Sequence, residues 1–192
     1  MNENYLDDKE RQEDEFLKDM EYSLREKKLF MLCGLPYSGK STLRRIIMDK
    51  NPGIVLISAD QIRYQIYGQR YRQETEALMW AIRNHFLEIL FQNANYIIID
   101  ETNTTIKRRS PIIRLAKQYE YKVYCFYLDI DKDICINRIK ERNDIKMMSV
   151  IDRQIEQFEV PTMDEGFKEI YTITGNSYKF LNKVNIFEFN NK

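Results

Sequence analysis

Histidine and cysteine are scarce in this chain of 192 residues. There is one histidine, and the three cysteines, Cys33, Cys125 and Cys135, are widely spaced with no CxxC pair among them. This spacing argues against a zinc site and against a disulfide framework. Cys33 and Cys125 lie in apolar runs of strand length, so we expect buried free thiols and a reducing, cytoplasmic setting.

An excess of charge of either sign is also missing, because 30 lysines and arginines balance 30 aspartates and glutamates. This balance argues against a broad basic surface for nonspecific duplex binding but leaves room for a local basic cleft. No apolar run approaches the length of a membrane span, and the acidic N-terminus does not resemble a signal sequence. We therefore expect no membrane association, while the oligomeric state stays open.

The length fits a single domain. Residues 1–27 form an acidic leader in which Phe16, Met20 and Leu24 recur at helical spacing. We expect this leader to be a solvated helix or to be disordered, and the alternative is a contact with a partner or with the substrate cleft. Residues 28–192 are expected to form the domain itself.

A phosphate-binding loop organises this domain. Residues 34–41 read Gly-Leu-Pro-Tyr-Ser-Gly-Lys-Ser, which fits the pattern G-x-x-x-x-G-K-[ST]. An apolar run of strand length precedes the loop at 28–33, and a helical pattern follows it at 42–49. Strand, glycine loop and helix are the context that the motif requires.

The residue types of this loop suit a nucleoside triphosphate. Gly34 and Gly39 permit backbone angles that turn successive N–H groups toward phosphate oxygens. Lys40 can reach the β- and γ-phosphates, and the hydroxyl of Ser41 can bind Mg²⁺. We expect an ATP site formed by Gly34, Tyr37, Ser38, Gly39, Lys40, Ser41 and Thr42.

A second candidate group follows the β-branched run at 54–57. Ser58 and Gln61 have capping-box spacing, so a helix is expected to begin there. Asp60 and Arg63 would then share a helix face at the carboxyl edge of a parallel sheet. Asp60 could be the general base for an acceptor hydroxyl, and Arg63 could hold a phosphate of that acceptor. The alternative is that Asp60 only favours the helix N-terminus and Arg63 is a surface charge.

Acidic residues end the next buried run, at 96–100. Asp100 is expected to hold Mg²⁺, directly or through water, with Glu101 as its competitor for that role. Further along, the basic cluster at 107–109 is a candidate nucleic-acid contact or, alternatively, a solvated face. Residues 105–119 have a helical pattern, but Pro111 lies inside it and suggests that the helix begins close to the proline.

Two arginines are candidates for closing over the donor. Arg138 and Arg142 stand four apart in an expected helix at 134–143, so they share a face. On a mobile lid near 131–150 they could neutralise charge on a triphosphate. An ordinary basic helix face is the alternative.

Further periodic segments complete the expected fold. Helices are predicted at 74–93 and 147–158, and strands at 122–128 and 184–189. His85 lies within the first of these helices and is interpreted as a packing or surface residue, not a catalytic one. The apolar residues at helical spacing there are Leu78, Ile82, Phe86, Ile89 and Leu90. Five strands with intervening helices predict a parallel α/β sheet.

Taken in order, these motifs resemble the kinase domain of the polynucleotide 5′-hydroxyl kinase family over about residues 28–190. The stretches that carry the resemblance are GLPYSGKST at 34–42, ISADQIR at 57–63, IIIDETN at 97–103, CINRIKER at 135–142 and FEVPTMDEGF at 158–167. The resemblance implies a P-loop kinase-type five-stranded parallel sheet flanked by helices, with a helical lid.

The resemblance also implies a role for each candidate residue. Lys40 and Ser41 would bind ATP and Mg²⁺, and Asp60 would activate the acceptor hydroxyl. The remaining roles are acceptor phosphate binding by Arg63, acceptor positioning by Thr102, donor phosphate binding by Arg138 and Arg142, and the acidic metal position filled by Asp100 or Glu101.

The expected function is transfer of the γ-phosphate of ATP to the 5′-hydroxyl end of DNA or RNA. The first alternative is a kinase of a nucleoside, another small molecule or a modified base. The second is a nucleotide-binding module without phosphotransfer.

Overall fold

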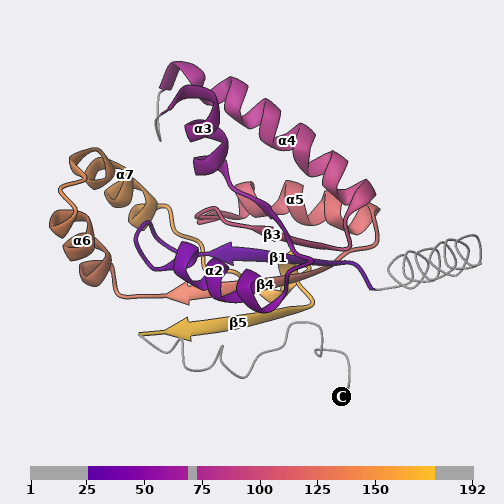
Figure 1. Cartoon of the computed structure of the whole chain (residues 1–192). Coiled ribbons are helices and arrows are strands. Elements are labelled where there is room, and N and C mark those ends of the chain that lie inside the picture. The colour runs from indigo at the N-terminus through magenta and orange to yellow at the C-terminus, as the bar shows by residue number, and fades with distance from the viewer. Residues whose placement is uncertain (1–25, 69–72, 176–192) are drawn as a thin grey trace, which may run out of the picture.

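The computed structural model describes residues 26–68 and 73–175 (Figure 1). The expected helical leader and the expected strand at 184–189 lie outside these ranges. Within the described part, no helix is both long enough and apolar enough to cross a bilayer.

One parallel sheet of five strands forms the centre of the domain, as predicted. Its strands lie in the order β2-β3-β1-β4-β5, and every neighbouring pair runs in parallel. The strands are β1 (Lys28–Cys33), β2 (Val55–Ile57), β3 (Tyr96–Ile99), β4 (Lys122–Asp129) and β5 (Glu169–Thr174). The predicted fold class is therefore confirmed.

The fifth strand was not identified from the sequence. β5 pairs with β4 from Tyr124↔Glu169 to Asp129↔Thr174, at the edge of the sheet. Most of its residues are exposed or half-buried, and Ile173 is its one buried residue. Because an edge strand of this kind lacks a continuous apolar run, its sequence gives a weak strand signal.

The helices surround the sheet (Figure 1). They are α2 (Lys40–Lys50), α3 (Ala59–Tyr67), α4 (Glu76–Asn93), α5 (Ile106–Gln118), α6 (Lys132–Glu141) and α7 (Ile145–Glu156). Figure 1 shows α4 and α5 on one side of the sheet and α2 on the other, with α6 and α7 beyond the carboxyl ends of the strands. These carboxyl ends are where ligands bind in open parallel sheets.

Strand alternation supplies two cores, one on each face of the sheet. Phe30 and Leu32 of β1 pack toward α2, where Leu43 and Ile47 are buried. Leu29 and Met31 alternate to the opposite face and join a cluster with residues of α4 and α5. Both faces are covered, which explains why β1 is buried along its whole length.

The buried face of α4 differs from the apolar face expected from the sequence. Leu78, Phe86 and Ile89 are 53%, 46% and 42% exposed. The buried side chains are instead Met79, Arg83, Leu87 and Phe91. The helix is apolar on more than one side, so periodicity alone did not select the face that packs on the sheet.

α5 agrees with the helical pattern at 105–119, but its start differs from the one that Pro111 suggested. The helix begins at Ile106 and not close to Pro111, which lies inside it. The carbonyl of Thr105 accepts hydrogen bonds from the backbone N–H groups of Arg108 and Arg109, at 3.0 and 3.1 Å. Pro111 is tolerated in the early part of the helix, and the basic cluster lies in the first turns.

Candidate active site at the phosphate-binding loop

The loop at 34–41 connects β1 to α2 and is packed closely against neighbouring strands. A Cβ atom on Gly34 would lie 2.9 Å from the carbonyl oxygen of Leu128 and 3.0 Å from Oγ of Ser38. The N–H of Gly34 donates to the carbonyl of Thr102 at 3.0 Å. Gly39 has a φ of 105° and is the N-cap residue of α2, where a larger residue would be strained.

Asn103 fastens this loop to the end of β3. Its side-chain amide donates to the carbonyl of Leu32 at 2.8 Å, and its own carbonyl accepts from the Cys33 thiol at 3.2 Å. The residue is buried, with a left-handed φ of 46°. Thr102 and Asn103 therefore belong to the framework that positions the start of the loop.

Lys40 lies inside the loop. Its Nζ donates to the carbonyl oxygens of Gly34 at 3.0 Å and Leu35 at 2.6 Å, and to Oγ of Ser38 at 3.4 Å. Burial lowers the pKa of this amine, and the nearby carboxylate of Asp100 opposes the shift. The amine is thus held among loop oxygens, next to where phosphate would bind.

Ser41 and Asp100 come together across the loop and β3. The Ser41 side chain is close enough to Asp100 to influence its carboxylate, and Nε of Arg44 lies 3.4 Å from Oδ2 of that carboxylate. Burial raises the pKa of Asp100, while Ser41, Lys40 and Arg44 act in the opposite direction. A hydroxyl and a carboxylate are hard oxygen ligands of the kind that Mg²⁺ prefers.

The other candidate acid, Glu101, is engaged elsewhere. Its two oxygens accept from Nε and Nη2 of Arg83, at 2.8 and 3.0 Å, and both side chains are almost completely buried. Among the described residues there is no cluster of three His, Cys, Asp or Glu side chains that could hold a metal. This donor set fits a Mg²⁺ ion held by Ser41 and Asp100 that keeps waters and takes phosphate oxygens.

Asp60 lies on the first turn of α3, open to solvent. Its side chain is 73% exposed, and Oδ1 accepts from Nη1 of Arg63 at 2.7 Å. Asp60, Asp100 and Lys40 follow the neighbouring parallel strands β2, β3 and β1, so the three groups lie at the same edge of the sheet. The carboxylate is accessible from the sheet edge and does not turn into the protein interior.

Arg63 is held by two acids from different helices. Besides the contact with Asp60, its Nε and Nη2 donate to the two oxygens of Glu76 on α4, at 2.6 and 2.8 Å. Three of its N–H groups therefore point at carboxylates. Glu76 could not be predicted as a partner of Arg63, because an acid 13 residues away in another helix leaves no local pattern in the sequence.

The segment expected to form a lid, which contains α6 and α7, contacts the loop through Tyr37. Nη1 of Arg138 donates to the carbonyl of Tyr37 at 3.0 Å, and the guanidinium of Arg142 lies 5.4 Å from the Tyr37 ring centre. The Tyr37 hydroxyl donates to Oδ2 of Asp144 at 2.8 Å. Both expected lid arginines thus lie next to the loop, while Ser38 is buried within it and Thr42 is exposed on α2.

The cluster at 107–109 divides into two kinds of residue. Arg109 is fully buried, with a two-pronged ion pair to Glu165, both distances 2.7 Å, and bonds to the carbonyls of Asn103 and Glu159. Lys107 and Arg108 are exposed. Arg109 is therefore a structural residue and not available to a ligand.

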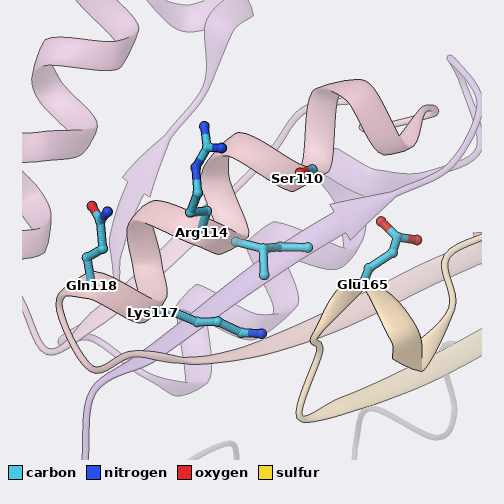
Figure 2. A pocket seen from close by; sticks show the side chains of 6 residues that line it. Ser110, Arg114, Lys117, Gln118 and Glu165 are labelled. Atoms are coloured by element: carbon cyan, nitrogen blue, oxygen red, sulfur yellow. The ribbon is translucent and has the colours of Figure 1, made fainter.

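A surface groove of about 460 Å³ lies along α5 (Figure 2). It is lined by Ser110, Ile113, Arg114, Lys117, Gln118 and Glu165. Nζ of Lys117 occupies the space that a Cβ on Gly166 would need. None of the predicted site residues lines this groove, so the candidate site remains at the loop.

Three curated relatives align with most of the chain. The 2′,3′-cyclic-nucleotide 3′-phosphodiesterase of Pongo abelii is 28% identical over 76% of this chain and 33% of its own length. The L-seryl-tRNA(Sec) kinase of Methanococcus maripaludis is 25% identical over 69% of this chain and 53% of its own length. The bifunctional polynucleotide phosphatase/kinase of Schizosaccharomyces pombe is 25% identical over 74% of this chain and 32% of its own length. The chain thus spans about a third of the length of the first curated relatives it matches.

Solved structures share the fold. A chain of the Pnkp1/Rnl/Hen1 RNA repair complex superposes with a TM-score of 0.60 and 22% identity, covering 69% of this chain and 44% of that one. The APS kinase CysC of Mycobacterium tuberculosis, in complex with AMPPNP and APS, superposes with a TM-score of 0.57 and 15% identity. This match covers 84% of this chain and 97% of that one. At these identities the likeness establishes a P-loop kinase-type fold.

The family model described as AAA domain matches residues 29–161, a segment that contains the phosphate-binding loop, Asp60, Asp100 and both lid arginines. The match covers well over half of the chain. This chain belongs to the AAA domain family, with the P-loop kinase-type fold.

Proposed function

We propose that this protein is an ATP- and Mg²⁺-dependent kinase that transfers the γ-phosphate of ATP to the 5′-hydroxyl of a nucleic acid. The observation that carries the proposal is the grouping of Lys40, Asp100 and the exposed Asp60 after the neighbouring parallel strands β1, β3 and β2, at one edge of the sheet. A donor phosphate bound in the loop would lie at the same edge of the sheet as this accessible carboxylate.

The chemistry follows from these positions. Asp60 accepts the proton of the acceptor hydroxyl as its oxygen forms a bond to the γ-phosphorus, and the bond from that phosphorus to the β,γ-bridging oxygen breaks. Lys40 and the loop N–H groups hold the donor phosphates, and Arg138 and Arg142 offset the charge that develops on them. Mg²⁺ bound at Ser41 and Asp100 would supply further charge neutralisation.

The nucleic-acid acceptor is supported by the polynucleotide phosphatase/kinase relative and the RNA repair neighbour. A second candidate is a kinase of a smaller hydroxyl compound. It is supported by the APS kinase fold neighbour. Both candidates use Asp60 and differ only in the acceptor pocket.

A transfer assay with γ-labelled ATP distinguishes them. The protein is offered 5′-hydroxyl DNA and RNA oligonucleotides, nucleosides and small alcohols, each with and without Mg²⁺. We expect label on the oligonucleotides, and label on small molecules alone would overturn the nucleic-acid assignment. Nucleotide binding with no labelled product would instead indicate a noncatalytic module.

Two variants test the chemistry within that assay. Asp60→Asn should abolish most transfer and leave ATP binding intact, whereas Asp49→Asn, an exposed acid on α2, should behave like the unchanged protein. Lys40→Ala should slow transfer by roughly 10²- to 10³-fold, by analogy with the loss of other preorganised charges. Full activity of either site variant would contradict the mechanism.

A further inference from the structure

Three guanidinium groups surround the single tryptophan of the chain, Trp80 on α4. The guanidinium carbons of Arg63, Arg83 and Arg108 lie 5.8, 5.8 and 5.6 Å from the Trp80 ring centre. The arginines come from three helices, α3, α4 and α5. Through Arg63, which donates to Asp60 at 2.7 Å, this cluster adjoins the proposed general base.

Two of the three arginines are neutralised by acids. Arg63 forms its two-pronged pair with Glu76, and Arg83 forms one with Glu101. Both guanidinium groups are largely buried in these pairs. Neither is readily released to a new anion, because separating a buried pair leaves an uncompensated charge.

Arg108 differs from the other two. It is exposed in the first turn of α5, and in the described ranges no acidic side chain forms an ion pair with it. The guanidinium of Arg108 lies over the Trp80 ring. A solvated guanidinium against an aromatic ring gains only about 0.5–1 kcal/mol, so a stronger anionic partner can displace it.

We propose that Trp80 and Arg108 form the subsite for the first nucleotide of the acceptor, with the indole stacking on the base and Arg108 binding the phosphate on its 3′ side. The inference rests on the proposed kinase function and names its acceptor more closely. Aromatic side chains stack on any base, and a free guanidinium suits a phosphate. Arg63, whose N–H groups already face Asp60 and Glu76, acts in this arrangement as a positioning residue for Asp60.

The composition of the chain gives a direct readout of this subsite. Because Trp80 is the only tryptophan, the indole fluorescence of the full chain reports on one position. Titration with a 5′-hydroxyl oligonucleotide, in the presence of saturating nonhydrolysable ATP analogue, should quench this fluorescence. Quenching by the analogue alone would place Trp80 at the donor base and overturn the proposal.

Kinetics test the two residues separately. Trp80→Leu should raise the KM for a 5′-hydroxyl oligonucleotide by roughly 5- to 100-fold without a comparable change for ATP, and Trp80→Phe should recover part of the loss. Arg108→Ala should lower kcat/KM by about 10- to 100-fold for a nucleoside 3′-phosphate and change it little for the unphosphorylated nucleoside. Equal losses on both acceptors would refute the phosphate contact.

The control is Arg114→Ala, which removes an exposed arginine from the same helix, two turns further on. The Arg114→Ala variant should retain the preference for the phosphorylated acceptor. Arg108→Ala should also reduce the slope of log binding constant against log salt concentration, measured with the oligonucleotide, by about 0.7. If oligonucleotides are labelled but fluorescence and both variants are unaffected, this subsite fails while the kinase function stands. If no oligonucleotide is labelled, the kinase proposal itself fails.

Discussion

The Ser41 side chain lies close enough to Asp100 to influence its carboxylate, which brings the last residue of the phosphate-binding loop next to the end of β3. Neighbouring Glu101 is instead enclosed in its pair with Arg83. The two adjacent acids therefore have different surroundings, and several of their properties should differ in ways that experiments can measure.

The first prediction concerns magnesium. Asp100→Asn should raise the Mg²⁺ concentration needed for half-maximal transfer and lower the maximal rate, because a charged oxygen ligand becomes a neutral one. Activity measured across a Mg²⁺ titration checks this. Glu101→Gln should leave the midpoint of that titration unchanged, and an equal shift in both variants would remove the assignment of Asp100.

The second prediction concerns pH and stability. Since burial raises the pKa of Asp100, the folded state retains a proton that the unfolded state loses, and stability falls as pH rises from about 3.8 through the raised pKa. Asp100→Asn lacks this titration. The Tm of the variant minus that of the unchanged protein should therefore increase between pH 4 and pH 7, as followed by thermal melts; a decrease would contradict the sign.

The third prediction separates Arg109 from its exposed neighbour. Arg109→Met leaves Glu165 buried without its partner and removes bonds to two backbone carbonyls, so unfolding should become easier by about 3–5 kcal/mol. Urea denaturation of Arg108→Ala should give a change within roughly 0.5 kcal/mol. Similar losses of stability in both variants would contradict a structural role for Arg109 that Arg108 does not share.

The fourth prediction concerns the lid. Arg138→Ala should lower kcat by roughly 10²- to 10³-fold, if its charge stabilises the transferring phosphate as proposed. Tyr37→Phe, which keeps the ring under Arg142 but loses the hydrogen bond to Asp144, should have a much smaller effect. A matched helix control is Arg153→Ala on α7, where the side chain is exposed.

A fifth prediction concerns Glu76, which holds Arg63. Glu76→Gln weakens the two-pronged pair and frees the guanidinium for other partners, so Asp60 loses a fixed orientation. We expect kcat to fall by about tenfold while ATP binding, measured by titration calorimetry, stays unchanged. An increase in kcat would show that Glu76 restrains the site and does not organise it.

The central sheet and the loop could be predicted because their signals are local. Lys28–Cys33 is a continuous apolar run, and the glycine loop has a fixed spacing that permits one known geometry. Ser58 was likewise identified from capping-box spacing, and its side chain accepts from the N–H of Gln61 at the start of α3. Each of these features depends on residues within a few positions of one another.

The buried charges could not be predicted because their partners are distant in the sequence. Arg83 lies on the buried face of α4 because Glu101 meets it from the end of β3, and Arg109 is buried because Glu165 meets it from the short helix Met163–Glu165. A helical wheel assigns an arginine to solvent by default. The same limitation misplaced the packed side of α4, where apolar residues occur on more than one face.

The enclosed amine of Lys40 has a consequence for how stability and activity are divided. Its water shell is exchanged for carbonyl oxygens of Gly34 and Leu35 when the chain folds, so the polypeptide bears the desolvation penalty before any nucleotide arrives. A neutral replacement at this position should yield a protein that resists heat better and transfers phosphate roughly 10²- to 10³-fold more slowly. The Lys40 side chain is therefore expected to lower the stability of the fold and to raise the rate of phosphate transfer.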